Sequence, residues 1–93
     1  MIIGLLTLEI YLPYSHSLKE KRKTLNKLRD RLKKRHNIAF AELDYQNKWQ
    51  RSIIGLVTLN TQKQIIENLF HKIVQEAIEN IEGEILQQKI HFF

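Results

Sequence analysis

The transition from a strand to a helix lies in residues 13–22, which read PYSHSLKEKR. Pro13 ends the strand before it, because proline lacks the N–H group that a sheet ladder needs. Ser17 fits the N-cap of the following helix, and Glu20 three residues later completes a capping box. The pattern therefore predicts a helix over residues 18–36, with apolar residues recurring at helical spacing.

Strand-like patterning surrounds this helix. Residues 2–12 alternate with a period of two, and one face is apolar apart from Gly4, so that face should meet the core. Residues 38–45 and 49–60 read as two further strands, joined as a hairpin by a short polar turn.

A second helix and a last strand complete the pattern. Thr61 and Gln64 form another capping-box pattern, and a wide apolar stripe follows until Gly83. Residues 84–93 read as the fourth strand. The order β-α-β-β-α-β with two right-handed crossovers predicts a single α+β domain over residues 1–93, a ferredoxin-like sandwich whose antiparallel sheet has the strand order 4-1-3-2. Both helices would cover one face of the sheet and leave the other, here called the open face, uncovered.

The composition is that of a globular, basic protein. Of its 93 residues, 43% are hydrophobic and 27% are charged, and the net charge is +5 with a pI near 9.6. This balance favours nucleic acid, anionic lipid headgroups or acidic proteins as partners. The absence of cysteine excludes disulfides and thiolate metal sites. No apolar run reaches the roughly 18 residues of a membrane span, so we expect a soluble, cytoplasmic protein that does not associate with membranes.

The predicted first helix concentrates the positive charge. Ten of the fifteen Lys and Arg residues lie within residues 19–35, and only Glu20 and Asp30 are acidic there. Such a surface can follow a phosphate backbone through salt-sensitive contacts that do not depend on sequence. The alternative is an ordinary solvated helix face. The residues expected to bind nucleic acid, here called the basic face, are Lys19, Lys23, Lys27, Lys33 and Lys34.

The topology brings the start of this helix close to the turn between the second and third strands. Lys21 is unexpected there, because it falls within the apolar stripe of the helix. It either holds an anion, pairs with Glu42 or Asp44, or packs its stem while the ammonium reaches water. Trp49 either belongs to the same site or is a core or rim residue. We predict an anion pocket or polar cluster that comprises Ser17, Lys21, Arg22, Glu42, Asp44, Trp49 and Arg51.

The open face suggests a partner protein. If alternate residues of the second strand from Ala39 onward pack inward, Phe40 lies on the open face and forms an apolar patch that a partner would cover. The third strand contains no aromatic residue, which argues against base stacking on the sheet and favours a protein partner, for example a second copy of the chain. The predicted dimer face comprises Ile3, Leu5 and Phe40.

Little in the sequence indicates catalysis. Glu42 and Asp44, two residues apart on a strand, could bind a cation or act as an acid–base pair, but the pattern favours their pairing with Lys21, Arg22 or Arg51. The four histidines lack metal-ligand spacing, and there is no Gly-rich phosphate loop, HExxH or GxSxG motif. Ser15 and Ser17 flank His16, but neighbours on one loop rarely hold the geometry of a nucleophile and its base. We therefore expect no catalytic residue, metal or cofactor, and the sequence identifies no small-molecule substrate.

Two blocks of sequence resemble the YlxP-like family of small bacterial proteins, whose function is unknown. The first block is Pro13 with Ser17-Leu18-Lys19 and Lys21-Arg22, and the second is Ala41-Glu42-Leu43-Asp44 with Trp49-Gln50-Arg51 and Gly55. The resemblance covers nearly the whole chain and implies a ferredoxin-like fold. Family members are often encoded near translation and ribosome-maturation factors, which implies a link to RNA or the ribosome. Ala39-Phe40 departs from the small polar residues that the family often has near this strand.

Together these observations predict a non-enzymatic RNA-binding or ribosome-associated factor that contacts the phosphate backbone through its first helix. The alternative is a homodimeric interaction module that uses the open face. The two functions are compatible with each other, because they use different surfaces.

Overall fold

The computed structural model describes all 93 residues and has the predicted order of elements. Each helix spans 18 residues. The elements are β1 (Ile2–Tyr11), α1 (Leu18–Arg35), β2 (Ala39–Asp44), β3 (Arg51–Asn60), α2 (Lys63–Asn80) and β4 (Glu84–Phe92).

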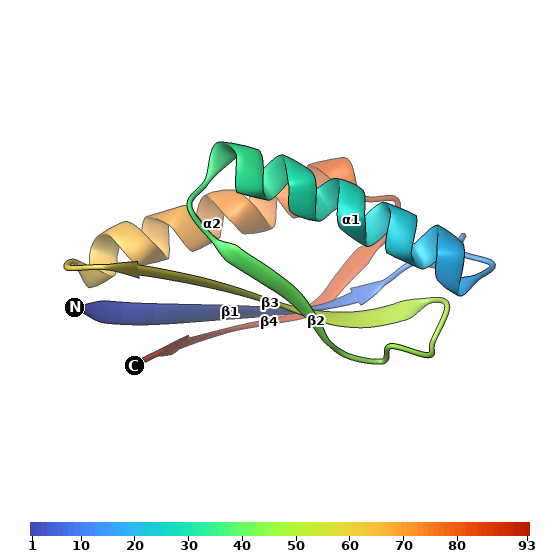
Figure 1. Cartoon of the computed structure of the whole chain (residues 1–93), viewed down its shortest axis with the longest axis horizontal. Helices are drawn as coiled ribbons and strands as arrows, with labels where there is room; N and C mark the ends of the chain where they lie inside the picture. Colours follow the sequence, from blue (N-terminus) through green and yellow to red (C-terminus); the bar gives the residue numbers. More distant parts are fainter.

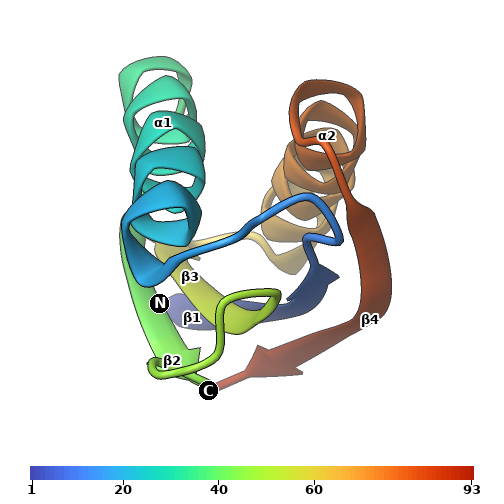
Figure 2. The same ribbon diagram turned by 90° about the vertical axis from the view of Figure 1, so that its right-hand side faces the viewer.

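The four strands form one antiparallel sheet in the order β2-β3-β1-β4, which is the predicted order counted from the opposite edge. Both helices lie on the same side of this sheet (Figure 1). Viewed from the end, α1 lies toward the β2 edge and α2 toward the β4 edge (Figure 2). The ferredoxin-like α+β fold is therefore confirmed.

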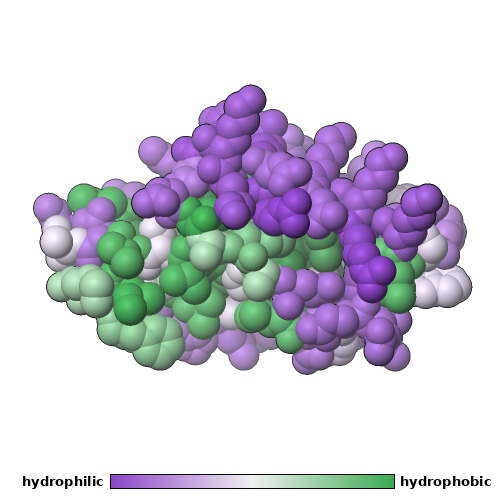
Figure 3. All heavy atoms as spheres, in the orientation of Figure 1, coloured by the Kyte–Doolittle hydropathy of each residue, from purple (hydrophilic) through white to green (hydrophobic).

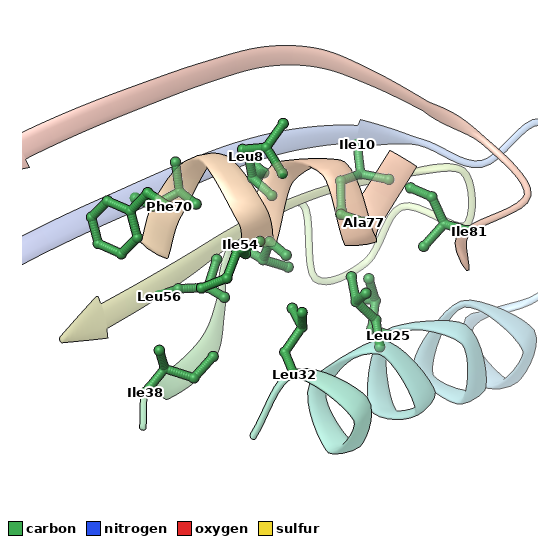
Figure 4. Close-up of a cluster of buried hydrophobic side chains, with 14 of the residues drawn as sticks. Leu8, Ile10, Leu25, Leu32, Ile38, Ile54, Leu56, Phe70, Ala77 and Ile81 are labelled. Carbon is green, nitrogen blue, oxygen red and sulfur yellow. The ribbon is translucent and has the colours of Figure 1, made fainter. Parts of the chain in front are cut away.

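The core lies between the helices and the covered face of the sheet. Leu6, Leu8 and Ile10 of β1 are fully buried, as the alternation of this strand predicts. They form one cluster with apolar residues of both helices, and the close-up in Figure 4 shows Leu32 of α1 and Phe70 of α2 among its members. Sixteen buried apolar residues form this one cluster, and full burial of a large aliphatic side chain contributes about 1.5–3 kcal/mol.

The start of α1 is capped as the sequence predicts, with one difference. The Ser17 hydroxyl accepts a hydrogen bond from the Glu20 N–H at 3.0 Å. The Glu20 carboxylate reaches back to the N–H of His16, at 2.6 Å, rather than to that of the cap residue. The helix ends at Arg35, one residue before the predicted end.

The second capping-box prediction is wrong. The N-cap of α2 is Gln62, whose side chain makes no capping hydrogen bond. Asn60 serves instead, since its side-chain oxygen accepts a hydrogen bond from the Gln62 N–H at 3.0 Å. The Thr61 hydroxyl caps no N–H group of the helix and instead donates to Asn60 Oδ1 at 3.4 Å.

The predicted orientation of β2 is also wrong, and Phe40 leaves the proposed dimer face. Phe40 pairs in register with Leu56, which is fully buried, and it packs against the core. Directly paired residues of antiparallel strands point to the same side of a sheet, so a shift of one residue exchanges the two faces. Ala39, Ala41 and the half-exposed Leu43 consequently lie on the open face, where β3 separates them from Ile3 and Leu5 of β1.

Candidate nucleic-acid interface and polar cluster

Most cations of α1 are exposed and have no carboxylate partner. Of the ten Lys and Arg residues in this helix, only Lys21, Arg29 and Arg35 form ion pairs. In the space-filling view, hydrophilic side chains gather over α1, whereas hydrophobic ones lie below it toward the end that holds both termini (Figure 3). The seven exposed, unpaired cations are the five lysines of the basic face together with Arg22 and Arg31.

One side of α1 forms the wall of a groove. Lys23, Lys27 and Arg31 follow each other at four-residue spacing and therefore lie on one stripe of the helix. They line a groove of about 640 Å³ that extends to Asn80 and Glu82 at the end of α2. Three cations of α1 thus lie along one wall of a concave surface, from which they can contact an anionic chain, and Glu20 and Glu82 also line the groove.

Lys21 is fully buried, and its ammonium is completely occupied by groups of the protein. Its Nζ donates to the main-chain oxygen of Tyr45 at 2.7 Å and to that of Arg51 at 3.2 Å, and it lies 3.0 Å from Glu42 Oε2. A longer contact of 3.4 Å reaches the oxygen of Gln46. The interpretation in which the ammonium reaches water is therefore wrong, because the side chain has no exposed area. Lys21 has no capacity left for an external anion.

Glu42 completes this arrangement from β2. It faces the helices, retains 19% of its side-chain exposure, and accepts a second hydrogen bond from the fully buried Ser52 hydroxyl at 2.7 Å. Because the carboxylate is shared by an ammonium and a hydroxyl, the buried charge of Lys21 is balanced locally. The Lys21–Glu42 pair is thus a structural element that joins α1 to β2 and β3.

The hairpin loop over residues 45–50 is held from a second side. The Gln50 amide donates to the main-chain oxygens of Pro13 at 3.0 Å and Ser15 at 3.3 Å, and the Leu12 N–H donates to the Gln50 oxygen at 2.8 Å. Tyr45 adopts φ = 62°, which is uncommon for a bulky residue. This conformation accompanies the hydrogen bond from Lys21 to its carbonyl. The loop is therefore fastened to both α1 and the segment before it.

The remaining members of the predicted cluster do not form one pocket. Arg22 is exposed, and Asp44 is exposed and accepts a hydrogen bond from the Tyr45 N–H at 2.7 Å. Arg51 forms an ion pair with Glu9 of β1 across the open face, and its guanidinium lies 5.0 Å from the Tyr45 ring centre. The hydrogen bond to Glu9 is the main reason why the pKa of Arg51 is raised above its ordinary value.

Trp49 is not a core residue, since 55% of it is exposed. Three residues that hold this region were absent from the predicted site: Glu9, Gln50 and Ser52. Gln50 could have been found from the sequence, because it lies in the second block that resembles the family. Glu9 and Ser52 could not, because their partners are decided by the register of the strands.

A separate contact joins the end of α1 to α2. Glu76 Oε1 accepts from Arg35 Nε at 3.0 Å and lies 3.2 Å from His36 Nε2. The other oxygen of Glu76 is buried and has no hydrogen-bond partner. This contact fixes the far end of the helix that carries the basic face. No three His, Asp or Glu side chains converge as a metal-like group.

Neither helix is both long and apolar enough to span a membrane.

The fold defines a small α+β protein in which one layer carries a basic helix and the other layer is a sheet with an open face. The chain belongs to the family described as "Protein of unknown function (DUF503)", whose model matches residues 3–90. The chain is 27% identical over 73 residues to "Uncharacterized protein YlxP" of Bacillus subtilis (strain 168), covering 78% of this chain and 79% of that protein.

Two solved structures are similar at low sequence identity. The "De novo designed protein Ferredog-Diesel" has a TM-score of 0.49 and 12% identity, with 96% of this chain and 83% of that chain covered. "LarC2, the C-terminal domain of a cyclometallase involved in the synthesis of the NPN cofactor of lactate racemase" has a TM-score of 0.44 and 14% identity, and 100% of this chain but only 56% of that chain is covered.

Proposed function

We propose that this protein is a cytoplasmic, non-enzymatic factor that binds RNA, such as ribosomal RNA, by contacting its phosphate backbone through α1. The observation that carries the proposal is the set of seven exposed cations on one helix that have no carboxylate partner. Unpaired like charges at four-residue spacing destabilise an isolated helix slightly. An anionic chain along α1 would neutralise them and release its own counterions.

The shape of the surface supports the same proposal. An 18-residue helix is about 27 Å long, so it can contact several successive phosphates. The groove beside Lys23, Lys27 and Arg31 gives these three cations a common side from which to approach one strand. Lys21 takes no part in binding, because its ammonium is occupied inside the protein.

A matched charge reversal tests this proposal. The double variant Lys23→Glu/Lys27→Glu should weaken binding of a labelled RNA at least tenfold and reduce the magnitude of the salt slope by about 0.7 per lost phosphate contact to single-stranded RNA. The control Lys72→Glu/Lys89→Glu changes the net charge equally at exposed positions of α2 and β4. Equal losses in both variants would show that only overall charge matters, and unchanged RNA affinity in the first would refute the role of α1.

The open face supports a second function, self-association. Leu43, Val57 and Leu59 are 49%, 38% and 61% exposed there, and Ile3 and Leu5 lie beside them. Contiguous exposed apolar residues of this kind mark interaction surfaces, and a second copy offers a matching apolar face. Phe40 is no part of this surface, because it packs inside.

Sedimentation equilibrium of wild type and two variants distinguishes a specific dimer from non-specific association. Leu59→Lys should convert a dimer to a monomer, whereas Ile65→Lys, at a 45% exposed position on α2, should not. A wild-type protein that remains monomeric at the highest concentration reached would exclude the homodimer.

A further inference from the structure

The chain's single tryptophan lies in the hairpin loop and projects into solvent. Trp49 is 55% exposed, although tryptophan is highly buried on average in folded proteins. Neither the core nor the Lys21–Glu42 pair uses its indole ring. An exposed aromatic side chain of this size is a characteristic contact residue of a binding surface.

The loop around Trp49 is held in place by contacts from α1 and from the segment before it. Lys21 binds the main-chain oxygens of Tyr45 and Arg51, which flank the loop, and Gln50 is bonded to the β1–α1 segment. The Lys48 N–H also donates to the Tyr45 oxygen at 2.9 Å. Trp49 therefore stands between fixed residues, and its exposure is a property of the folded loop. Such pre-ordering lowers the entropic cost of binding.

The surroundings of Trp49 have a composition suited to a nucleotide. A hollow of about 480 Å³ is lined by two aromatic residues, two cations and two amides, with no acidic residue among them. Arg51 is already paired with Glu9, whereas Lys48 has no carboxylate partner and is exposed. The lining residues are Tyr11, Asn47, Lys48, Trp49, Gln50 and Arg51.

This hollow lies at the same end of the molecule as the start of the basic helix. The first turns of α1 and the hairpin loop are adjacent in the end-on view (Figure 2), as the bonds from Lys21 to the loop require. Arg22, which follows Lys21 in α1, is exposed and has no carboxylate partner. A single strand whose phosphates lie along α1 would therefore bring its bases toward Trp49 as it leaves the helix.

We infer that Trp49 is a stacking platform for an unpaired base of a single-stranded nucleic acid, with Lys48 contacting the adjacent phosphate; this rests on the proposed function. Base–aromatic stacking tolerates any sequence and contributes about 1–3 kcal/mol per base, whereas bases inside a duplex are not available to it. The protein consequently prefers single-stranded RNA to duplex RNA of equal length. The sheet contributes only Tyr11 and Arg51, the strand-end residues that line the hollow, and β3 contains no aromatic residue on which a further base could stack.

The single tryptophan makes the inference directly measurable. Titration with a ten-nucleotide single-stranded RNA should quench Trp49 fluorescence with the same midpoint as the anisotropy of a labelled copy. Inorganic polyphosphate, which has charge but no bases, should compete for binding without quenching. RNA binding with unchanged fluorescence would overturn the inference and leave the proposed function standing, whereas no RNA binding at all would overturn both.

Substitution of Trp49 provides a second test of the inference. Trp49→Leu should weaken single-strand binding by about tenfold, which corresponds to about 1.4 kcal/mol, and leave duplex binding unchanged. Phe93→Leu removes another exposed aromatic residue, 74% exposed at the chain end, and should change neither. Equal single-strand affinity for Trp49→Leu and wild type would overturn the inference. So would a concentration-dependent blue shift of Trp49 emission without RNA, which would assign the residue to a protein contact.

Discussion

Lys21 and Glu42 form an ion pair of 3.0 Å in which the lysine side chain has no exposed area. The pair joins the first turns of α1 to β2, and through Ser52 to β3. Moving an ammonium out of water costs several kcal/mol, which hydrogen bonds to main-chain oxygens and the carboxylate must offset. Because these partners flank the hairpin loop, the pair shapes the end of the molecule where the proposed RNA contacts begin.

Replacement of Lys21 by methionine should destabilise the fold strongly. Lys21→Met fills a similar volume but leaves the Glu42 charge and two main-chain oxygens without their donor, so we expect a loss of about 3–5 kcal/mol. A loss of this size should lower the thermal midpoint by more than about 10 °C in a domain of this length. Urea unfolding followed by circular dichroism measures it.

Two further variants identify the cause. Lys19→Met removes an exposed lysine of the same helix and should change stability by less than about 0.5 kcal/mol. Lys21→Met/Glu42→Gln should lose less than the sum of the two single changes, because the second change removes the unpaired charge. Strict additivity would mean that the two side chains do not stabilise each other.

The order of elements was predictable because strand and helix periods are local properties of sequence. The burial of Lys21 was signalled in the same way, by a charged residue within an apolar stripe. The hydrogen-bond acceptors of Lys21 could not be predicted, because Tyr45 and Arg51 contribute main-chain oxygens, which every residue type has. The direction of Phe40 was missed because Ala39 and Ala41 are small enough for either face, so that only pairing with β3 decides it.

Two glycines should respond differently to alanine. A methyl group at Gly83 would overlap the main-chain oxygen of Tyr11, which cannot move without distorting β1. At Gly55 the added carbon would lie 2.6 Å from a terminal carbon of Leu43, a half-exposed side chain that can rotate away. We expect Gly83→Ala to cost at least about 2 kcal/mol and Gly55→Ala less than about 1 kcal/mol. Chemical denaturation of both variants measures these losses. A larger loss for Gly55→Ala than for Gly83→Ala would contradict this explanation.

Loss of the Glu76 charge should loosen the end of α1. Glu76→Gln weakens the contacts to Arg35 and His36, but Arg35 is 55% exposed, so the expected loss is only about 1 kcal/mol. Hydrogen exchange should accelerate in the last turn of α1 more than in its first turn. Glu79→Gln, at an exposed position one turn along α2, is the control and should leave exchange unchanged. Equal acceleration in both variants would show that general electrostatics, and not this contact, holds the helix end.

The Gln50 side chain should link the order of the hairpin loop to binding. Gln50→Ala removes the hydrogen bonds to Pro13 and Ser15 but leaves Lys21 bonded to Tyr45 and Arg51, so the fold should persist with a loss of about 1–2 kcal/mol. A less ordered loop must be ordered on binding, which lowers affinity for single-stranded RNA several-fold. Duplex affinity should stay constant, because the basic face is unchanged. Faster hydrogen exchange across the loop with unaltered single-strand affinity would show that ordering of Trp49 does not contribute to recognition.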